Sequence, residues 1–197
     1  MGCMHSWVWG EIYPGFMDAL MPLACLPVQI AGRNRIWRKM VIDAIRQDPE
    51  WKDGEYATQP RAALQIAADF LIIAGSAPLL MQANLATREA ADQYLADSRQ
   101  RITTSLDAND FLYALSSSRN YDPSSQLGSI TAPMMFVNSA DDFVNPAELG
   151  IAQREMQKVK RGQFILLPAS AQTHGHGTHT WAAVWQQYLQ QLLEESR

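Results

Sequence analysis

Residues 134–146 read MMFVNSADDFVNP, and this stretch decides the fold. It begins as a short apolar strand, Met134 to Asn138, and runs into two aspartates. A helix then opens at Pro146, and a second strand follows over Gln163 to Leu167. The apolar residues on one face of that predicted helix are Leu149, Ala152, Met156 and Val159. The order strand, helix, strand predicts a right-handed parallel crossover, the unit of an α/β fold.

Polar residues follow both strands, at the rim where parallel sheets bind ligands. Asp141 and Asp142 follow the first strand, and residues 173–179, THGHGTH, follow the second. Because the carboxyl ends of parallel strands share one rim, we expect a carboxylate and an imidazole to meet there. A carboxylate that fixes the tautomer of a histidine is two-thirds of a nucleophilic triad. Acid before histidine is also the chain order of α/β-hydrolases.

Two other interpretations of these residues stay open. Asp141 or Asp142 could cap the helix near Pro146, a role compatible with catalysis. The three histidines of the 173–179 loop have an HxHxxH spacing that could bind a metal. However, the loop is rich in glycine, and no nearby Asp, Glu or Cys completes a familiar metal pattern. We therefore favour the triad and predict neither a bound metal nor a cofactor.

Residues 1–27 belong to the same α/β part of the chain. His5 to Ile12 is rich in large apolar residues and predicts a helix that ends at Tyr13-Pro14-Gly15. Ala19 to Leu26 is a buried run that predicts a central parallel strand. Together with residues 131–197, this part is expected to form the core.

Residues 28–130 have a different pattern, with helical periodicity and almost no strand signal. We expect helices over Ala62 to Ile73 and Thr87 to Arg101, and a further helix capped by Asp107. A block of helices between strands is typical of an inserted lid. A separate helical bundle is the alternative.

Composition excludes several classes of protein. Charged residues make up 18% of the chain and hydrophobic ones 47%, with a formal net charge of −4. Basic residues are scattered, so we expect no nucleic-acid partner. No apolar run reaches the roughly 18 residues of a membrane helix, so we expect no membrane association. Two cysteines, Cys3 and Cys25, without a CxxC spacing slightly favour a reducing, cytoplasmic compartment, and the sequence leaves localisation otherwise open.

The segment GCMHSW, residues 2–7, resembles the residues just after the nucleophile in homoserine O-acetyltransferase-like α/β-hydrolases. In that family the nucleophile turn reads Gly-x-Ser-Met-Gly-Gly and leads into a helix and a Tyr-Pro. Met1-Gly2-Cys3 and Tyr13-Pro14 stand at those places here. The resemblance continues over residues 29–51 and 106–113 and returns at the acid and histidine loops. It implies a partial α/β-hydrolase fold, with the C-terminal strands of a parallel sheet and an inserted helical lid.

The resemblance also chooses between neighbouring residues. The acid of the family lies four residues before a proline, which selects Asp142 over the runner-up Asp141 when counted from Pro146. The histidine of the family comes directly after a glycine, which selects His176 and leaves His179 in reserve.

The nucleophilic serine of the family would stand immediately before Met1, so this chain has the acid and histidine without it. Cys3 and Ser6 fall inside the predicted helix and do not replace it; we interpret Cys3 as a packed cysteine. The backbone N–H of Met1 carries over as an oxyanion donor, weakly, because the peptide bond to the serine is missing. We expect the chain as written to be inactive, with an internal methionine at its start.

Two departures bear on the substrate. The lid arginine associated with the carboxylate of homoserine falls near Ala68, and the aspartate that comes after the family histidine is replaced by Gly177. An amino-acid zwitterion would lose both charged contacts. The resemblance therefore implies an acyltransferase or an ester hydrolase acting on a small-molecule acyl donor, such as acetyl-CoA, and a less polar acceptor.

Two further expectations concern the isolated chain. The alternative to an enzyme is a non-catalytic α/β-hydrolase remnant or interaction module. In addition, the strand near Ala19 to Leu26 would lack a neighbour, and an exposed apolar strand edge favours association. We therefore expect marginal stability or a homo-oligomer.

Overall fold

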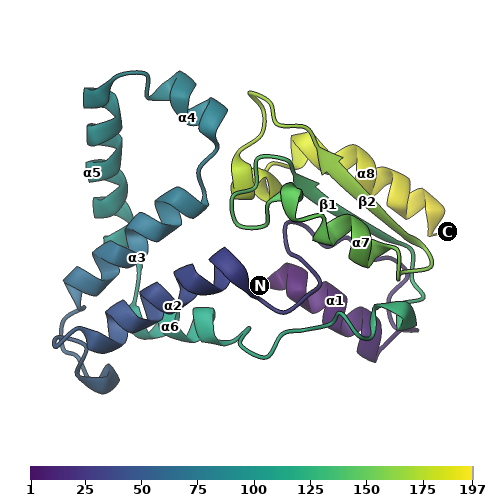
Figure 1. Ribbon diagram of the computed structural model, residues 1–197, viewed down its shortest axis with the longest axis horizontal. Coiled ribbons are helices and arrows are strands. Elements are labelled where there is room, and N and C mark those ends of the chain that lie inside the picture. Colours follow the sequence, from purple (N-terminus) through teal and green to yellow (C-terminus); the bar gives the residue numbers. More distant parts are fainter. Residues whose placement is uncertain (197) are drawn as a thin grey trace. The chain divides into compact units, whose positions relative to one another are not determined.

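A computed structural model describes residues 1–196, and the chain forms two compact units (Figure 1). The first, here the sheet unit, comprises residues 1–29, 76–80 and those from Tyr121 onward. The second, the helical unit, comprises residues 30–75 and 81–120. The insertion expected over 28–130 stays a prediction; its range differs from the helical unit at residues 28–29, 76–80 and 121–130, which lie in the sheet unit. Residues 121–130 belong with the sheet because Leu127 and Ile130 are fully buried there.

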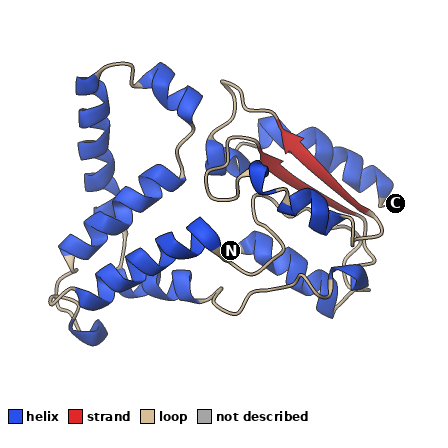
Figure 2. Cartoon of the chain, in the orientation of Figure 1, coloured by secondary structure: helices blue, strands red, loops and turns tan. Residues whose placement is uncertain are grey.

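The sheet unit contains the two strands, coloured red in Figure 2. Its helices are α1 (Gly2–Ile12), α7 (Ile151–Met156) and α8 (Ala182–Glu195), with 3-10 turns η2 (Leu127–Ser129), η3 (Ala147–Leu149) and η4 (Gly175–Thr180). The helical unit contains α2 (Gly32–Gln47), η1 (Lys52–Gly54), α3 (Arg61–Ala74), α5 (Arg88–Ser105) and α6 (Ala108–Ser116). Helix α4 (Pro78–Asn84) spans the division between the units.

Strands β1 (Met134–Ser139) and β2 (Gly162–Leu167) pair in parallel, from Met134 opposite Gly162 to Ser139 opposite Leu167. Every residue of β1 is buried, as expected for a central strand covered on both faces. The rings of Trp7 and Phe164 contact the ring of Phe136, with centroids 5.5 and 5.2 Å away. This aromatic contact packs α1 against the sheet.

The expected strand over Ala19 to Leu26 is wrong as a continuous strand. The segment lies parallel to β1 and makes isolated bridges at Leu20 and Leu23. The carbonyl of Pro22 accepts from the N–H of Val137 at 3.1 Å, but a proline has no N–H to return. The ladder is therefore interrupted where the sequence places Pro22.

The expected helix opening at Pro146 is also divided. It forms the short turn η3 and then α7, separated by Gly150 in the left-handed region (φ 63°). Leu149 is consequently exposed, whereas Ala152, Met156 and Val159 are buried as expected.

The helical unit has a core of its own. Its buried members are Val41, Ile45, Ala63, Leu64, Ala67, Ala108 and Leu112. As predicted, Asp107 caps α6, accepting from the N–H of Asp110 at 3.0 Å. Among the described residues no single helix is long and apolar enough to cross a membrane, although α3 and α4 pass that test together as a bent pair.

Candidate active site

The loop after β1 holds the carboxylate of Asp142 in a fixed, buried position. Asp142 is 1% exposed. Its backbone N–H donates to the carbonyl of Ser139 at 3.1 Å, and its Oδ1 accepts from the N–H groups of Val144 and Asn145 at 2.8 and 3.1 Å. An aspartate that satisfies backbone N–H groups two and three residues on forms a tight turn at a strand end. The turn leaves the carboxylate able to accept from one more donor.

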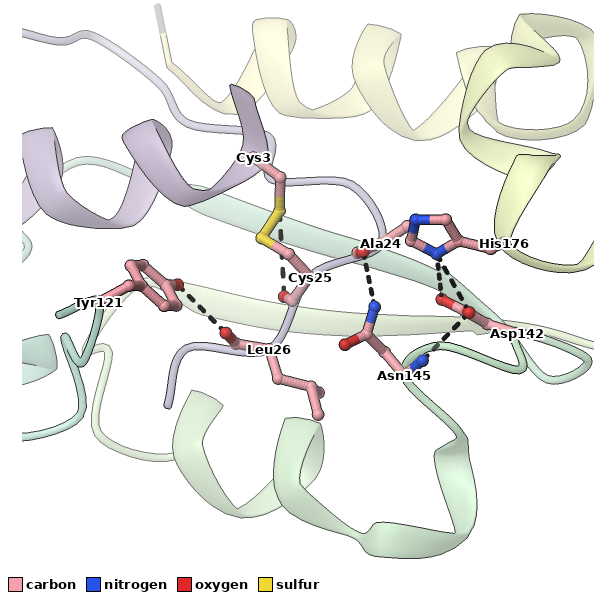
Figure 3. The surroundings of a disulfide bond; sticks show 8 residues. All are labelled: Cys3, Ala24, Cys25, Leu26, Tyr121, Asp142, Asn145 and His176. Carbon is pink, nitrogen blue, oxygen red and sulfur yellow. Dashed lines mark hydrogen bonds and ion pairs between the residues drawn. A yellow bond between two sulfur atoms is a disulfide. The ribbon is translucent and has the colours of Figure 1, made fainter. Parts of the chain in front are cut away.

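That donor is His176, in η4 after β2. Its Nδ1 lies 3.1 Å from each oxygen of Asp142, and Figure 3 shows the imidazole facing the carboxylate. Because an ionised carboxylate only accepts, this contact requires a proton on Nδ1, which leaves Nε2 as the basic nitrogen. The side chain of His176 is 31% exposed and that of Asp142 is 0% exposed. The pair therefore has a buried acid and an imidazole that reaches the surface.

Asp141 has different partners. Its carboxylate accepts from the hydroxyl of Ser139, from Thr173 Oγ1 at 2.8 Å and from the N–H of Gly175 at 3.3 Å. Gly175 is left-handed (φ 57°), and a Cβ there would clash with the carbonyl oxygen of Ser76. Asp141 thus connects the end of β1 to the histidine loop, while Asp142 contacts the histidine itself.

The other loop histidines make separate contacts. His174 stacks on Trp181, with ring centroids 4.0 Å apart. His179 Nδ1 lies 2.5 Å from the carbonyl oxygen of His176. Within residues 1–196, no three His, Cys, Asp or Glu side chains are grouped to hold a metal, so the HxHxxH spacing has no support as a metal site.

A hollow beside His176 is lined on its apolar side by Leu23, Val137, Leu167 and Trp185, and on its polar side by Asn138, Ser139 and His179. The mixture places apolar surface within reach of the imidazole.

Met1, the predicted oxyanion donor, stands immediately before α1, and its carbonyl accepts from the N–H of Met4 at 2.9 Å. The structure does not bring its N–H to any partner in the site, so the role stays a prediction.

The expectation that Cys3 is a packed, unpaired cysteine is wrong. Cys3 forms a disulfide with Cys25, with Cα atoms 6.0 Å apart. Neither the number of cysteines nor their spacing of 22 residues indicated this pair. The disulfide also removes the support that two unpaired thiols gave to a reducing compartment.

Asn145 is a buried site neighbour that the sequence did not indicate. Besides donating its N–H to Asp142, it donates from Nδ2 to the carbonyl of Ala24 at 2.9 Å. Asn138 Nδ2 donates to the carbonyl of Asn145 at the same distance. The only sequence signal was its place just before Pro146, at the end of the acid loop.

The two family departures lie in different units. Ala68 is fully buried in α3, and its neighbour Asp69 forms a two-point ion pair with Arg99 at 2.6 and 2.7 Å. Gly177, in η4, donates its N–H to the carbonyl of His174 at 3.0 Å. Neither position supplies a charged side chain.

No protein-family model matches the chain. A homoserine O-acetyltransferase from Moorella thermoacetica is 27% identical to it, over 74% of this chain and 45% of the relative. One from Citrifermentans bemidjiense has the same identity and the same two coverages. The chain therefore spans about half the length of the curated relatives it matches.

The solved homoserine O-acetyltransferase of Bacillus anthracis has the same fold, with a TM-score of 0.84 at 17% identity; the match covers 98% of this chain and 57% of that one. An acetylester hydrolase from Corynebacterium glutamicum gives 0.80 at 18% identity, with coverages of 98% and 58%. By sequence the chain is similar to homoserine O-acetyltransferases, and it has the fold of the α/β-hydrolases.

Proposed function

We propose that this chain carries the acid and the histidine of a serine-type site for acyl transfer or ester hydrolysis. The observation that supports it is the contact between His176 Nδ1 and the fully buried carboxylate of Asp142. A carboxylate in this position fixes the tautomer of the imidazole and stabilises its charged form. Asp141 and His179, the runners-up from the sequence, do not make this contact.

The mechanism depends on that tautomer. Nε2 of His176 takes the proton of a serine hydroxyl while the serine oxygen attacks the carbonyl carbon of a small acyl donor. Asp142 holds the resulting imidazolium, and backbone N–H groups stabilise the oxyanion. The imidazolium then protonates the leaving group, and an alcohol or water accepts the acyl group in a second step.

The serine itself is proposed to lie outside residues 1–197, immediately before Met1, where the family resemblance places it. The N–H of Met1 would then be an ordinary peptide N–H at the start of α1, a position suited to an oxyanion donor. Activity is therefore proposed for the protein that includes that serine.

We propose an acyl acceptor less polar than homoserine, because two charged residues of the family pattern are missing here. Ala68 and Gly177 offer no charge to a substrate carboxylate or amine. The apolar side of the hollow beside His176 favours an acyl ester or a simple alcohol instead. Matches of similar quality to an acetyltransferase and to an acetylester hydrolase leave transfer and hydrolysis as two outcomes of one mechanism.

The test uses p-nitrophenyl acetate with two proteins. One is the 197-residue chain, and the other is the product of the same reading frame extended upstream through a Gly-x-Ser segment. We expect turnover only in the extended protein, with a loss of about 10⁴-fold in Asp142→Asn and a similar loss in His176→Ala. His174→Ala, which changes a stacked histidine outside the pair, is the matched control and keeps most of the activity.

Two results would overturn the proposal. Turnover by the 197-residue chain that disappears in His176→Ala would place the nucleophile inside this chain. An extended protein with no turnover, or with turnover insensitive to His176→Ala, would favour the non-catalytic remnant.

A further inference from the structure

Asn145 joins the acid loop to a segment more than a hundred residues away in sequence. Its backbone N–H donates to Asp142 Oδ1 at 3.1 Å, and its side chain donates from Nδ2 to the carbonyl of Ala24 at 2.9 Å. Both ends of this connection are buried, with Asn145 6% and Ala24 7% exposed. A buried amide that uses its donors in this way fixes the distance between the two backbones.

The acceptor, the carbonyl of Ala24, belongs to a residue with an unusual backbone conformation. Ala24 has φ 55°, a left-handed conformation that residues with a Cβ rarely adopt. Such a residue persists only where its surroundings determine it from several sides. Here its N–H donates to the carbonyl of Val137 at 3.0 Å, and its carbonyl accepts from Asn145.

The residues after Ala24 are held by two further contacts. Cys25 is covalently joined to Cys3 in the first turn of α1. The carbonyl of Leu26 accepts from the hydroxyl of Tyr121 at 3.1 Å. Burial and the nearby carboxylate charges of Glu11 and Asp122 raise the pKa of Tyr121, so its hydroxyl stays protonated and keeps donating. Figure 3 shows the disulfide, the segment and the acid loop as one connected group.

We propose that Asn145 is a positioning residue for the Asp142–His176 pair, and that the Cys3–Cys25 disulfide anchors the carbonyl that Asn145 binds. The relevance of this to catalysis rests on the proposed function, because the resemblance places the nucleophile immediately before α1. The disulfide would then join the start of the nucleophile's helix to the segment that orients the acid. Asn145 acts only through Asp142.

The experiment measures the tautomer of His176 by NMR in the 197-residue chain with ¹⁵N-labelled histidine. Spectra are recorded at about pH 8.5, two units above the ordinary imidazole pKa. The resonances of His176 are assigned by their loss in His176→Gln. We expect the Nδ1–H tautomer to dominate in the unchanged chain, because Asp142 accepts from Nδ1.

Asn145→Ala should lower the ratio of Nδ1–H to Nε2–H tautomer by about threefold to tenfold, the range set by one net hydrogen bond. Cys3→Ser/Cys25→Ser should shift the ratio in the same direction by less. Asn109→Ala is the matched control. It removes a bond of the same kind, from Asn109 Nδ2 to the carbonyl of Gly54 at 3.0 Å, and also the bond that Asn109 Oδ1 accepts from Trp51 Nε1 at 2.8 Å. Both bonds lie in the helical unit, so His176 should be unchanged.

An unchanged tautomer ratio in folded Asn145→Ala would overturn the positioning role. If Asn145→Ala does not fold, the double cysteine variant decides, and an unchanged ratio there overturns the anchoring role of the disulfide. A shift of the tautomer ratio in Asn109→Ala as large as in Asn145→Ala would mean that any loss of a side-chain hydrogen bond affects His176. That result would also overturn the proposal. The tautomer measurement requires no turnover. If Asn145→Ala shifts the tautomer ratio of His176 but the extended protein has no esterase activity, only the proposed function is refuted.

Discussion

Asp142 in the sheet unit and Asp107 in the helical unit are two carboxylates with similar local geometry and different surroundings. Both accept backbone N–H groups from residues two or three positions ahead, Asp142 from Val144 and Asn145, and Asp107 from Asp110. Each also accepts from side chains distant in sequence. The local turn alone therefore does not distinguish a catalytic candidate from a structural cap.

The side-chain partners make the difference. Asp107 accepts from Tyr56 at 2.8 Å and Gln59 at 2.5 Å, groups that keep their protons at neutral pH. Asp142 accepts from His176, an imidazole, which is the side-chain type most often used as a general base. Asp142 is also fully buried, while Asp107 is only partly so. Burial combined with a titratable partner is the feature that separates the site from the scaffold.

The largest expected effect comes from removing each carboxylate. Asp142→Ala leaves two backbone N–H groups and an imidazole without an acceptor, and we expect a loss of about 3 kcal/mol or more in the free energy of unfolding. Asp107→Ala should cost about 1 kcal/mol, the usual loss for a helix cap, because water can reach its other donors. Urea unfolding followed by circular dichroism measures both. Equal losses would mean that burial does not distinguish the two sites.

A comparison of two glycines, Gly175 and Gly150, tests the close packing around the histidine loop. Gly175 and Gly150 have similar positive φ angles, 57° and 63°, but of the two only Gly175 lies against a neighbouring backbone, at Ser76 and Asp141. Gly150→Ala should cost about 1 kcal/mol for the left-handed conformation alone. Gly175→Ala should cost about 2–3 kcal/mol, because the clash with the Ser76 carbonyl adds to that strain. Thermal melts of the two variants give the difference, and similar melting temperatures would contradict the close approach.

Elements defined by local patterns could be predicted from the sequence. The strand at Met134 was indicated by a short apolar run after a proline, and the Asp107 cap by an acidic residue before an apolar helical stripe. A meeting of a carboxylate and an imidazole was expected because the carboxyl ends of neighbouring parallel strands share a rim, and the family resemblance selected Asp142 and His176. Each of these depends on residues near one another in sequence or on topology.

Features that depend on distant partners were missed. Nothing local indicates that Cys3 pairs with Cys25, or that Asn145 reaches the carbonyl of Ala24 across 121 positions. The break at Pro22 was predictable in principle, since a proline within a ladder always removes a donor. The apolar residues around it nevertheless form the pattern of a buried strand, which predicts a continuous ladder.

The smallest expected effect is the pH dependence of the stability that Asp107 contributes. The pKa of Asp107 is lowered from 3.8, first by the backbone N–H of Asp110 and then by Gln59 and Tyr56. A carboxyl with a lowered folded pKa contributes stability that is complete above its unfolded pKa and is lost as pH falls through the folded value. Asp107→Asn should therefore be less stable than the unchanged chain at pH 7.

That difference should shrink below about pH 4 and vanish once Asp107 is protonated in the folded chain as well. Unfolding of both proteins by urea from about pH 7 to about pH 2.5 measures it. Tyr56→Phe offers a check, since it removes one donor to the carboxylate and should reduce the pH-dependent part without abolishing the cap at Asp110. A difference between Asp107→Asn and the unchanged chain that is constant across this range would show that the charge of Asp107 contributes nothing.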